Sequence, residues 1–361
     1  MPEVPLHAQH LALGAKMGPF GGWDMPIEYS AGTVAEHTAV REAVGIFDVS
    51  HMGKLSITGS DARGFVNAVL TNDLERVTPG QAQYSMLCND SGGIIDDLIV
   101  YLVSADEVRI IPNASNASVV AQVLQSVAPE HITVTNDHLD KGIIAVQGPQ
   151  SSSLMRALGL PEDHDYMSFV DATWNSHSLT VCRTGYTGEH GYEIVMANAG
   201  LVKLWAALLE AGKAFGLLPC GLGARDTLRT EMGYPLHGQD ISPDISPVQA
   251  RTSWAVGWKK PAFAGRDALV AEKESGPQSV AWGLLATGRG IPRAHMHVMT
   301  ASGEQVGETT SGTFSPTLQV GIALALLSPS INEGDELVVD VRGRPLPVRV
   351  TKPPFVAAHT K

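Results

Sequence analysis

Tyr84-Ser-Met-Leu-Cys-Asn-Asp-Ser-Gly-Gly-Ile-Ile-Asp-Asp-Leu-Ile-Val-Tyr-Leu-Val103 is the stretch around which the rest of the chain is organised. Both halves of the stretch are rich in aliphatic and aromatic residues. The cluster Asn89-Asp-Ser-Gly-Gly93 between them is typical of a turn, because its glycines can adopt a positive φ. The pattern therefore predicts a β-hairpin.

The second arm of this hairpin carries two adjacent carboxylates, Asp96 and Asp97. Side chains alternate along a strand, so Asp97 shares its face with Tyr101, whereas Asp96 shares the opposite face with Leu98. A carboxylate in an apolar strand is costly unless it finds a partner. We interpret Asp96 as a structural group that accepts backbone N–H bonds, and Asp97 as a group that lines a ligand pocket.

The composition limits the classes of function. A chain of 361 residues with 44% hydrophobic residues should form two or three domains, and 37 glycines and 22 prolines favour turns and β structure. A formal charge of −12 argues against binding to nucleic acid or to an anionic membrane. The three scattered cysteines indicate reduced thiols, and neither a signal peptide nor a membrane span is evident. We expect a cytoplasmic protein, although a processed mitochondrial form would look the same.

The order of elements predicts helices and strands that alternate, followed by a strand-rich end. Helical spacing predicts helices over residues 5–17, 31–44, 61–70, 115–127, 201–215 and 223–232. Residues 47–52 are typical of a strand, and residues 241–255 indicate a connection. The group Trp254, Trp258 and Phe263 is expected in a core or at a domain seam. From residue 279 onward, short strands and turns predict a separate β-barrel or sandwich.

Two glycine-containing motifs leave alternatives open. The run from Thr184 to Glu193 contains neither GxGxxG before a helix nor the GK[ST] of a phosphate-binding loop. It is either an ordinary hairpin turn or a segment that directs Tyr186 and Glu193 into a pocket, where a glutamate can accept two N–H donors from a flat heterocycle. Gly221-Leu-Gly-Ala-Arg-Asp226 begins a helix, and its Arg225 is either solvated or aimed at a ligand.

Two further groupings of polar residues do not form a site. Asp48, Ser50 and His51 have the residue types of a catalytic triad, but neighbours along one strand alternate between faces and cannot form a relay. His7 and His10 have the spacing of a metal pair on a helix, yet no third ligand is near, so we expect no metal.

Five motifs occur along the chain in a fixed order. They are Phe47-Asp-Val-Ser-His-Met-Gly53, Gly92-Gly-Ile-Ile-Asp-Asp-Leu98, Arg183-Thr-Gly-Tyr-Thr-Gly-Glu189, Gly221-Leu-Gly-Ala-Arg-Asp226 and Thr310-Ser-Gly-Thr-Phe-Ser-Pro-Thr317. This set resembles the signatures of the T proteins of the glycine cleavage system, the aminomethyltransferases, over residues 5–355. Single motifs also occur in the folate domains of dimethylglycine and sarcosine dehydrogenases, but the chain has no flavin domain.

The resemblance implies an α+β fold in which three domains form a cloverleaf around a central folate pocket. Residues 1–46 and 140–245 would form a discontinuous first domain, and residues 47–139 an inserted second domain. Residues 246–278 would be a connection, and residues 279–361 a C-terminal β-barrel. The family usually has a Glu-Ala-Gly-Leu-like run before the tryptophan that leads into the third domain, whereas this chain has Val248-Gln-Ala-Arg-Thr-Ser-Trp254.

The resemblance also assigns site residues. Asp97 matches the catalytic aspartate of the family, which is the residue that strand alternation directs into a pocket. The residues that match folate-binding positions are Glu193, Arg225, Tyr84, Tyr101, Tyr186 and Met52. The implied one-carbon acceptor is tetrahydrofolate, with no metal, flavin or nucleotide.

The implied reaction moves a one-carbon unit from the lipoyl arm of H protein to tetrahydrofolate, with release of ammonia and formation of 5,10-methylenetetrahydrofolate. Two alternatives belong to other classes. One is another tetrahydrofolate-dependent demethylase, and the other is a folate-binding protein without catalytic activity that aids iron–sulfur assembly. The second group generally has a cysteine motif in its C-terminal half, whereas the last cysteine here is Cys220.

Overall fold

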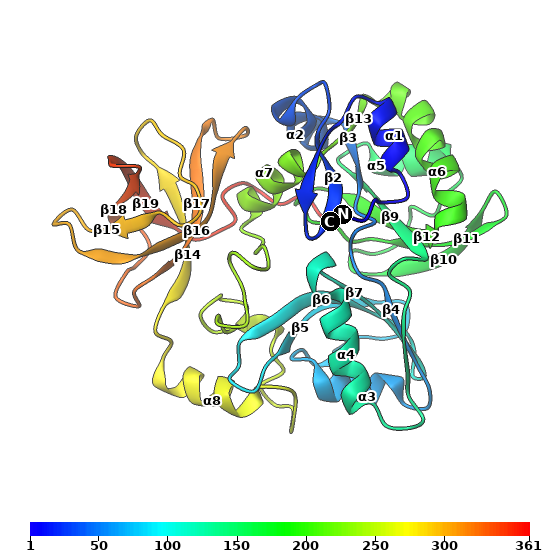
Figure 1. The fold of residues 1–361 in the computed structure, drawn as a ribbon, viewed down its shortest axis with the longest axis horizontal. Helices are drawn as coiled ribbons and strands as arrows, with labels where there is room; N and C mark the ends of the chain where they lie inside the picture. Colours follow the sequence, from blue (N-terminus) through cyan, green and yellow to red (C-terminus); the bar gives the residue numbers. More distant parts are fainter.

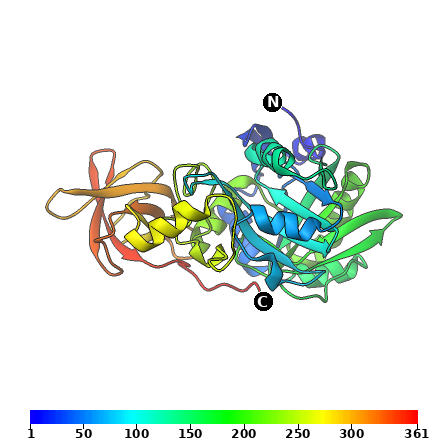
Figure 2. The same ribbon diagram turned by 90° about the horizontal axis from the view of Figure 1, so that it is seen from below.

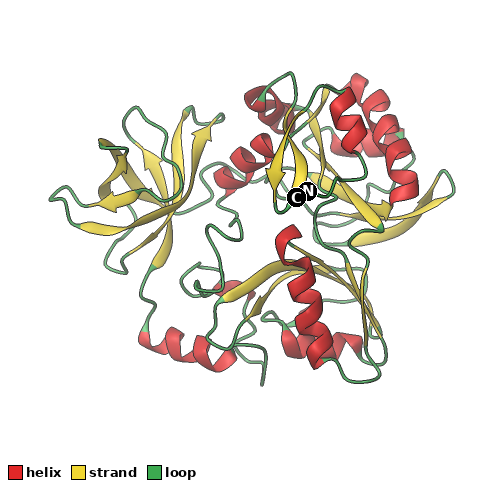
Figure 3. Ribbon diagram, in the orientation of Figure 1, coloured by secondary structure: helices red, strands yellow, loops and turns green.

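The structure, a computed structural model, describes residues 1–361. Its strands form a six-stranded sheet, a five-stranded sheet and a closed barrel, together with the small pair β1 (Lys16–Phe20) and β2 (Trp23–Glu28). Figure 1 shows these units as three lobes around the middle of the molecule, and Figure 3 shows that the barrel lobe is built from strands and loops. The predicted α+β class and the C-terminal β-barrel are confirmed.

The first lobe is built on the six-stranded sheet, in the order β10-β11-β12-β9-β3-β13. Its strands are β3 (Val44–Asp48), β9 (Lys141–Gln147), β10 (Phe169–Trp174), β11 (His177–Cys182), β12 (Gly191–Ala197) and β13 (Leu217–Pro219). Its helices are α1 (His7–Ala12), α2 (Thr33–Glu42), α5 (Ser151–Ala157), α6 (Asn198–Gly212) and α7 (Leu222–Met232). Leu201, Leu204, Trp205 and Leu208 recur at helical spacing on α6 and are fully buried, which fixes this helix on the sheet.

The second lobe contains the predicted hairpin at one edge of a sheet in the order β5-β6-β7-β4-β8. Its strands are β4 (Leu55–Thr58), β5 (Ala82–Cys88), β6 (Ile94–Ser104), β7 (Glu107–Pro112) and β8 (Thr133–Asn136), and its helices are α3 (Ala62–Val69) and α4 (Ala117–Val127). Antiparallel β5 and β6 are joined through Asn89, whose side-chain oxygen accepts the N–H of Gly93 at 2.9 Å. The lobe begins and ends at one place, because Leu55 pairs with Asn136.

The barrel closes in the order β14-β17-β16-β15-β18-β19. Its strands are β14 (Val280–Ala286), β15 (His297–Met299), β16 (Gln305–Ser315), β17 (Val320–Leu327), β18 (Glu336–Val341) and β19 (Arg344–Thr351). The segment that leads into the barrel includes α8 (Arg266–Ser275) and packs Phe263 and Leu269 against Met86 and Ile94 of the hairpin. This connection is therefore part of a hydrophobic core. None of the helices combines the length and the apolar composition needed to cross a bilayer.

The structure differs from the sequence-based elements in three places. The helix expected to reach residue 17 ends at Ala12, and Gly14 then adopts a φ of +71° before β1. The strand expected over residues 47–52 ends at Asp48, whose carboxylate accepts the Ser50 N–H at 2.8 Å and turns the chain. A domain boundary at residues 46/47 would divide β3. The proposed division into domains otherwise stays a prediction.

Candidate active site

Asp96 and Asp97 lie on opposite faces of β6, as strand alternation predicts. Asp96 is fully buried, and its carboxylate accepts the backbone N–H of Asn113 at 2.9 Å. The side-chain amides of Asn113 and Asn116 donate to its other oxygen at 2.9 and 2.6 Å. The interpretation of Asp96 as a structural acceptor of backbone N–H bonds is confirmed.

Asp97 has a different set of partners. Its carboxylate accepts the hydroxyl of Tyr84 at 3.1 Å and the side-chain amide of Asn113 at 2.7 Å. Burial raises the pKa of Asp97, and these two hydrogen bonds and the nearby His237 oppose that shift. Burial and the neighbouring charge of Asp97 raise the pKa of Asp96 to about 7. The pair therefore holds its protons more tightly than exposed carboxyls do.

An aromatic pair extends from Asp97 towards the connecting segment. The ring of Tyr84 stacks on Trp254, with centroids 5.2 Å apart, and 63% of Trp254 is exposed. Of the two places expected for this group, a core or a domain seam, Phe263 lies in a core, whereas Trp254 lies outside any core and stacks on a residue of the second lobe. The altered run before Trp254 contacts the barrel, because the Arg251 guanidinium carbon lies 3.5 Å from the Trp282 ring centroid.

Arg225 lies in the first turn of α7, above an aromatic ring. Its guanidinium carbon is 4.6 Å from the ring centroid of Tyr186, which also stacks on Tyr234 at 5.6 Å. Burial lowers the pKa of Arg225, and the nearby carboxylate of Glu193 opposes this shift. No hydrogen bond or ion pair within the chain engages the Arg225 guanidinium. Its five N–H donors thus remain free for a ligand.

Glu193 on β12 has a hydrogen bond to only one of its two carboxylate oxygens. One oxygen of its carboxylate accepts the Thr184 hydroxyl at 2.5 Å, and the Thr184 hydroxyl is 3.1 Å from the hydroxyl of Tyr101. No cation lies within ion-pair distance of Glu193. The other carboxylate oxygen is therefore available as an acceptor, close to the free donors of Arg225.

Met52 and its neighbour His51 complete this side of the site. Met52 is half-buried and packs against the core cluster that contains Phe47 and Ala224, the residue before Arg225. His51 is buried, and burial together with the charge of Arg225 lowers its pKa to about 3. His51 is consequently neutral at physiological pH, and its Nδ1 atom has no hydrogen-bond partner.

The rejected triad is indeed no triad. Asp48 binds His10 at 2.8 Å, and not His51. His7 pairs with Asp24 at 3.0 Å instead of with His10. No group of three or more histidine, cysteine, aspartate or glutamate side chains is arranged to hold a metal.

Several site residues have no signal in the local sequence. Asn113 bridges the two aspartates, Trp254 and Tyr234 stack on the site tyrosines, and His237 binds Asn116 at 3.0 Å. The pairing of Asn113 with the aspartates could have been anticipated only from the register of β6 against β7, which places Leu98 opposite Pro112.

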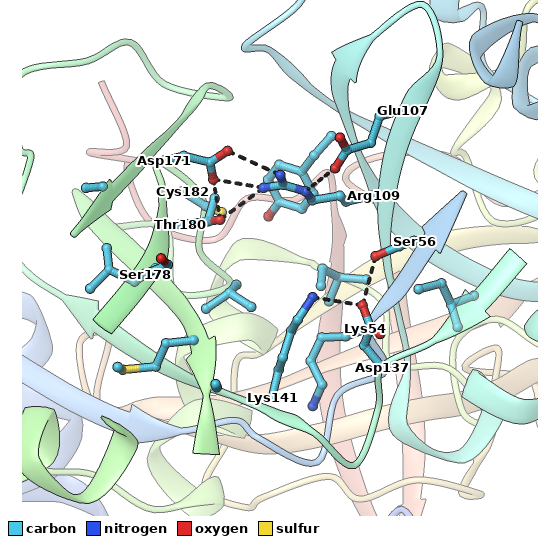
Figure 4. Close-up of a pocket in the computed structure, with 18 of the residues that line it drawn as sticks. Lys54, Ser56, Glu107, Arg109, Asp137, Lys141, Asp171, Ser178, Thr180 and Cys182 are labelled. Carbon is cyan, nitrogen blue, oxygen red and sulfur yellow. Dashed lines mark hydrogen bonds and ion pairs between the residues drawn. The ribbon is translucent and has the colours of Figure 1, made fainter. Parts of the chain in front are cut away.

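A cavity of about 620 Å³ lies between the first two sheets and borders this site. Figure 4 shows charged side chains around it that already pair with one another. Arg109 binds Asp171 and Lys141 binds Asp137, each at 2.8 Å. Tyr101 belongs to its lining, but Asp97, Glu193 and Arg225 do not. The cavity is therefore a seam between two lobes, separate from the free hydrogen-bonding groups.

The Thr310–Thr317 motif joins the barrel to α7. Asp240 accepts the hydroxyls of Thr310 and Ser311, and its second oxygen also binds Arg229 at 2.7 Å. Glu231 accepts the Ser315 hydroxyl and pairs with Arg41. This buried network fixes α7, the helix whose first turn carries Arg225.

The C-terminal tail returns from the barrel to the first lobe (Figures 1 and 2). The N–H of His359 donates to the carbonyl of Gly188 at 2.7 Å, and Arg183 donates to the carbonyl of Thr360 at 3.0 Å. The tail thereby holds the motif that contains Thr184 and Tyr186.

Comparisons with known proteins cover nearly the whole chain. Residues 6–260 match the family model of the GCVT N-terminal domain, and residues 281–357 match that of the glycine cleavage T-protein C-terminal barrel domain. The chain is 59% identical to an aminomethyltransferase of Frankia alni, over 98% of this chain and 97% of that protein. It is 55% identical to an aminomethyltransferase of Mycobacterium tuberculosis, over 100% and 99% of the two chains. The crystal structure of glycine cleavage system aminomethyltransferase T from Bartonella henselae superposes with a TM-score of 0.94 at 32% identity, over 99% of each chain.

Proposed function

Because the chain belongs to the glycine cleavage T-protein family and is an aminomethyltransferase of the glycine cleavage system, we propose that Asp97, Glu193 and Arg225 form its tetrahydrofolate site. The observation that carries this proposal is the unused hydrogen-bonding capacity of two buried or half-buried groups. Arg225 offers free donors, and Glu193 offers a free acceptor oxygen. A flat heterocycle with donors and acceptors on its edge satisfies both groups.

The other proposed contacts enclose the pterin and its neighbouring ring. Tyr84, Tyr186 and Met52 supply aromatic and apolar surface next to the charged groups, and Tyr101 supports Glu193. Stacking of Tyr84 on Trp254 offers a platform for a planar group.

We assign the chemical role to Asp97. The aminomethyl nitrogen takes up a proton and leaves as ammonia, so the carbon that remains on the lipoyl sulfur becomes cationic, and a fixed carboxylate in a low-dielectric site stabilises that charge. One folate nitrogen attacks this carbon, and the second folate nitrogen then attacks the same carbon as its bond to sulfur breaks. The sulfur leaves as a thiolate and takes up a proton, and Asp97 can accept a proton that a folate nitrogen loses. Tyr84 and Asn113 hold the Asp97 carboxylate in place during these steps.

The proposal also covers the donor of the one-carbon unit and the cellular location of the protein. The one-carbon unit arrives on the lipoyl arm of H protein, in line with membership of the glycine cleavage family. The named relatives are bacterial, which supports a cytoplasmic location. The alternatives of a demethylase and of a folate-binding protein without catalytic activity are disfavoured by 59% identity to an aminomethyltransferase.

The test is tetrahydrofolate affinity measured by calorimetry on Glu193→Ala and Arg225→Ala. Loss of one charged partner of a buried contact weakens binding by about 2–5 kcal/mol. Glu210→Ala and Arg349→Ala are matched controls, because these side chains are 75% and 55% exposed. Unchanged affinity in both site variants would refute the assignment.

A further inference from the structure

The Thr184 hydroxyl connects two groups that come from different lobes. Thr184 follows β11 in the first lobe and is 4% exposed. Its Oγ1 atom lies 2.5 Å from Oε2 of Glu193 and 3.1 Å from the hydroxyl oxygen of Tyr101, which projects from β6 of the second lobe. The three side chains form a continuous chain of hydrogen bonds across the seam between the lobes.

The direction of this chain follows from its chemistry. An ionised carboxylate only accepts, so the single hydroxyl proton of Thr184 is donated to Glu193. The hydroxyl of Tyr101 must then donate to Thr184. Tyr101 is 4% exposed, and burial keeps its pKa well above the usual value, so the phenol retains its proton. The hydrogen bonds therefore run in one direction, from the Tyr101 hydroxyl to the Thr184 hydroxyl and from there to the Glu193 carboxylate.

Glu193 needs such support because nothing else fixes its carboxylate. No cation lies within ion-pair distance, and Thr184 is its only hydrogen-bond partner. A free glutamate side chain has about 1.5–2 kcal/mol of rotamer entropy to lose when a ligand fixes it. Restraint before binding reduces this loss and keeps the acceptor at the correct position.

We propose that Thr184 and Tyr101 are positioning residues that hold Glu193 for the amine-bearing edge of the folate heterocycle. This inference rests on the proposed role of Glu193. Thr184 anchors Oε2 and leaves Oε1 free for a ligand N–H group. Oε2 keeps a second acceptor site, so a bidentate contact with two neighbouring N–H groups remains open.

The Thr184 hydroxyl is not required to hold its own backbone. Gln147 donates to the Thr184 carbonyl at 3.2 Å, and this bond survives any change of the side chain. A purely structural role for the hydroxyl would therefore leave folate binding unchanged when the hydroxyl is removed.

The experiment compares Thr184→Val with a matched variant on the preceding strand, β11. Thr180→Val also removes a threonine hydroxyl, which donates to Asp171 on the neighbouring strand β10 (Figure 4). We expect Thr184→Val to raise the Kd for tetrahydrofolate about 10- to 100-fold, since a hydrogen bond to a charged group is lost. Thr184→Ser should restore the affinity, and Thr180→Val should leave it unchanged.

Two further readouts distinguish positioning from general damage. Tyr101→Phe should weaken binding about 2- to 10-fold, because a bond between neutral groups is lost one step away. With lipoylated H protein as donor, Thr184→Val should raise the KM for tetrahydrofolate while kcat changes little, which is the signature of lost ground-state binding.

The outcomes separate this inference from the proposed function. If Glu193→Ala weakens binding but Thr184→Val does not, the positioning role is wrong and the folate site stands. If Thr180→Val weakens binding as much as Thr184→Val, the effect is not specific and the inference is also overturned. If Glu193→Ala has no effect, the proposed site itself fails.

Discussion

The two faces of β6 each carry an aspartate, but the two carboxylates differ in burial and in hydrogen-bond partners. The Asp96 carboxylate is fully buried and accepts three hydrogen bonds, all from Asn113 and Asn116. The Asp97 carboxylate is half-buried and is held by Tyr84 and Asn113, on the face of the proposed folate site. Asp96 has all its hydrogen bonds from two asparagines of the second lobe, whereas Asp97 has two hydrogen bonds that fix its position. The difference shows that two neighbouring residues of one type can have different hydrogen-bond partners, and it supports the proposal that only Asp97 takes part in the chemistry.

The largest effect should come from Asp97→Asn. The amide keeps the shape of the side chain but cannot stabilise a cationic carbon or accept a proton. We expect kcat to fall about 10²–10⁴-fold while tetrahydrofolate affinity changes little. The measurement is turnover with saturating lipoylated H protein, beside calorimetry with folate. A kcat within a few-fold of the parent would show that the charge of Asp97 is not needed, so that neither aspartate of β6 would have a chemical role.

Asp96→Ala should act on stability. The change leaves the buried backbone N–H of Asn113 without its acceptor, so we expect the free energy of unfolding to fall by about 3 kcal/mol. Denaturant titration measures this loss. Turnover per folded molecule should fall far less than in Asp97→Asn, and a larger loss of turnover than of stability would assign a chemical role to Asp96.

The pH dependence of stability should reveal the coupling of the two aspartates. The folded-state pKa of Asp96 is about 7, above the usual value of 3.8, so between these values the folded state binds more protons than the unfolded state. Its contribution therefore lowers stability as pH rises from about 4 to 7. Asp97→Asn removes the neighbouring charge that helps to raise this pKa. The variant should gain stability relative to the parent at pH 8, and the gain should vanish near pH 4. A gain independent of pH would disprove the coupling.

The smallest effect should come from Asn116→Ala. Its amide donates to Asp96 and also contacts His237, but Asn113 still supplies two donors to the carboxylate. We expect a loss of about 1 kcal/mol in the free energy of unfolding, measured by denaturant titration. A loss as large as that of Asp96→Ala would mean that Asn116, and not Asn113, satisfies the buried charge.

Local patterns predicted the hairpin and the direction of its aspartates. The turn at Asn89 and the alternation along β6 are set by neighbouring residues, so they can be read from the chain. The first helix was predicted to extend to residue 17, but it ends at Ala12. Gly14 adopts a positive φ there, and the sequence pattern did not reveal this turn.

The contacts that complete the site could not be predicted in this way. Tyr101 meets Thr184 across 83 positions in the sequence, and Asn116 meets His237 across 121. Trp254 is largely exposed and stacks on Tyr84, a pairing that connects the segment before the barrel with the second lobe. Such pairs depend on how separate lobes pack, for which neither spacing nor local propensity contains a signal.

The adjacent ends of the second lobe have a consequence for how the chain reaches its native state. β3 must pair with β9, yet the whole second lobe separates these strands. Closing so long a flexible loop is entropically costly and slow. Once the second lobe has folded, Leu55 lies beside Asn136, so its two ends emerge together. The lobe then acts as a template that shortens the effective loop between β3 and β9, and we expect its early formation to set the rate at which the six-stranded sheet assembles.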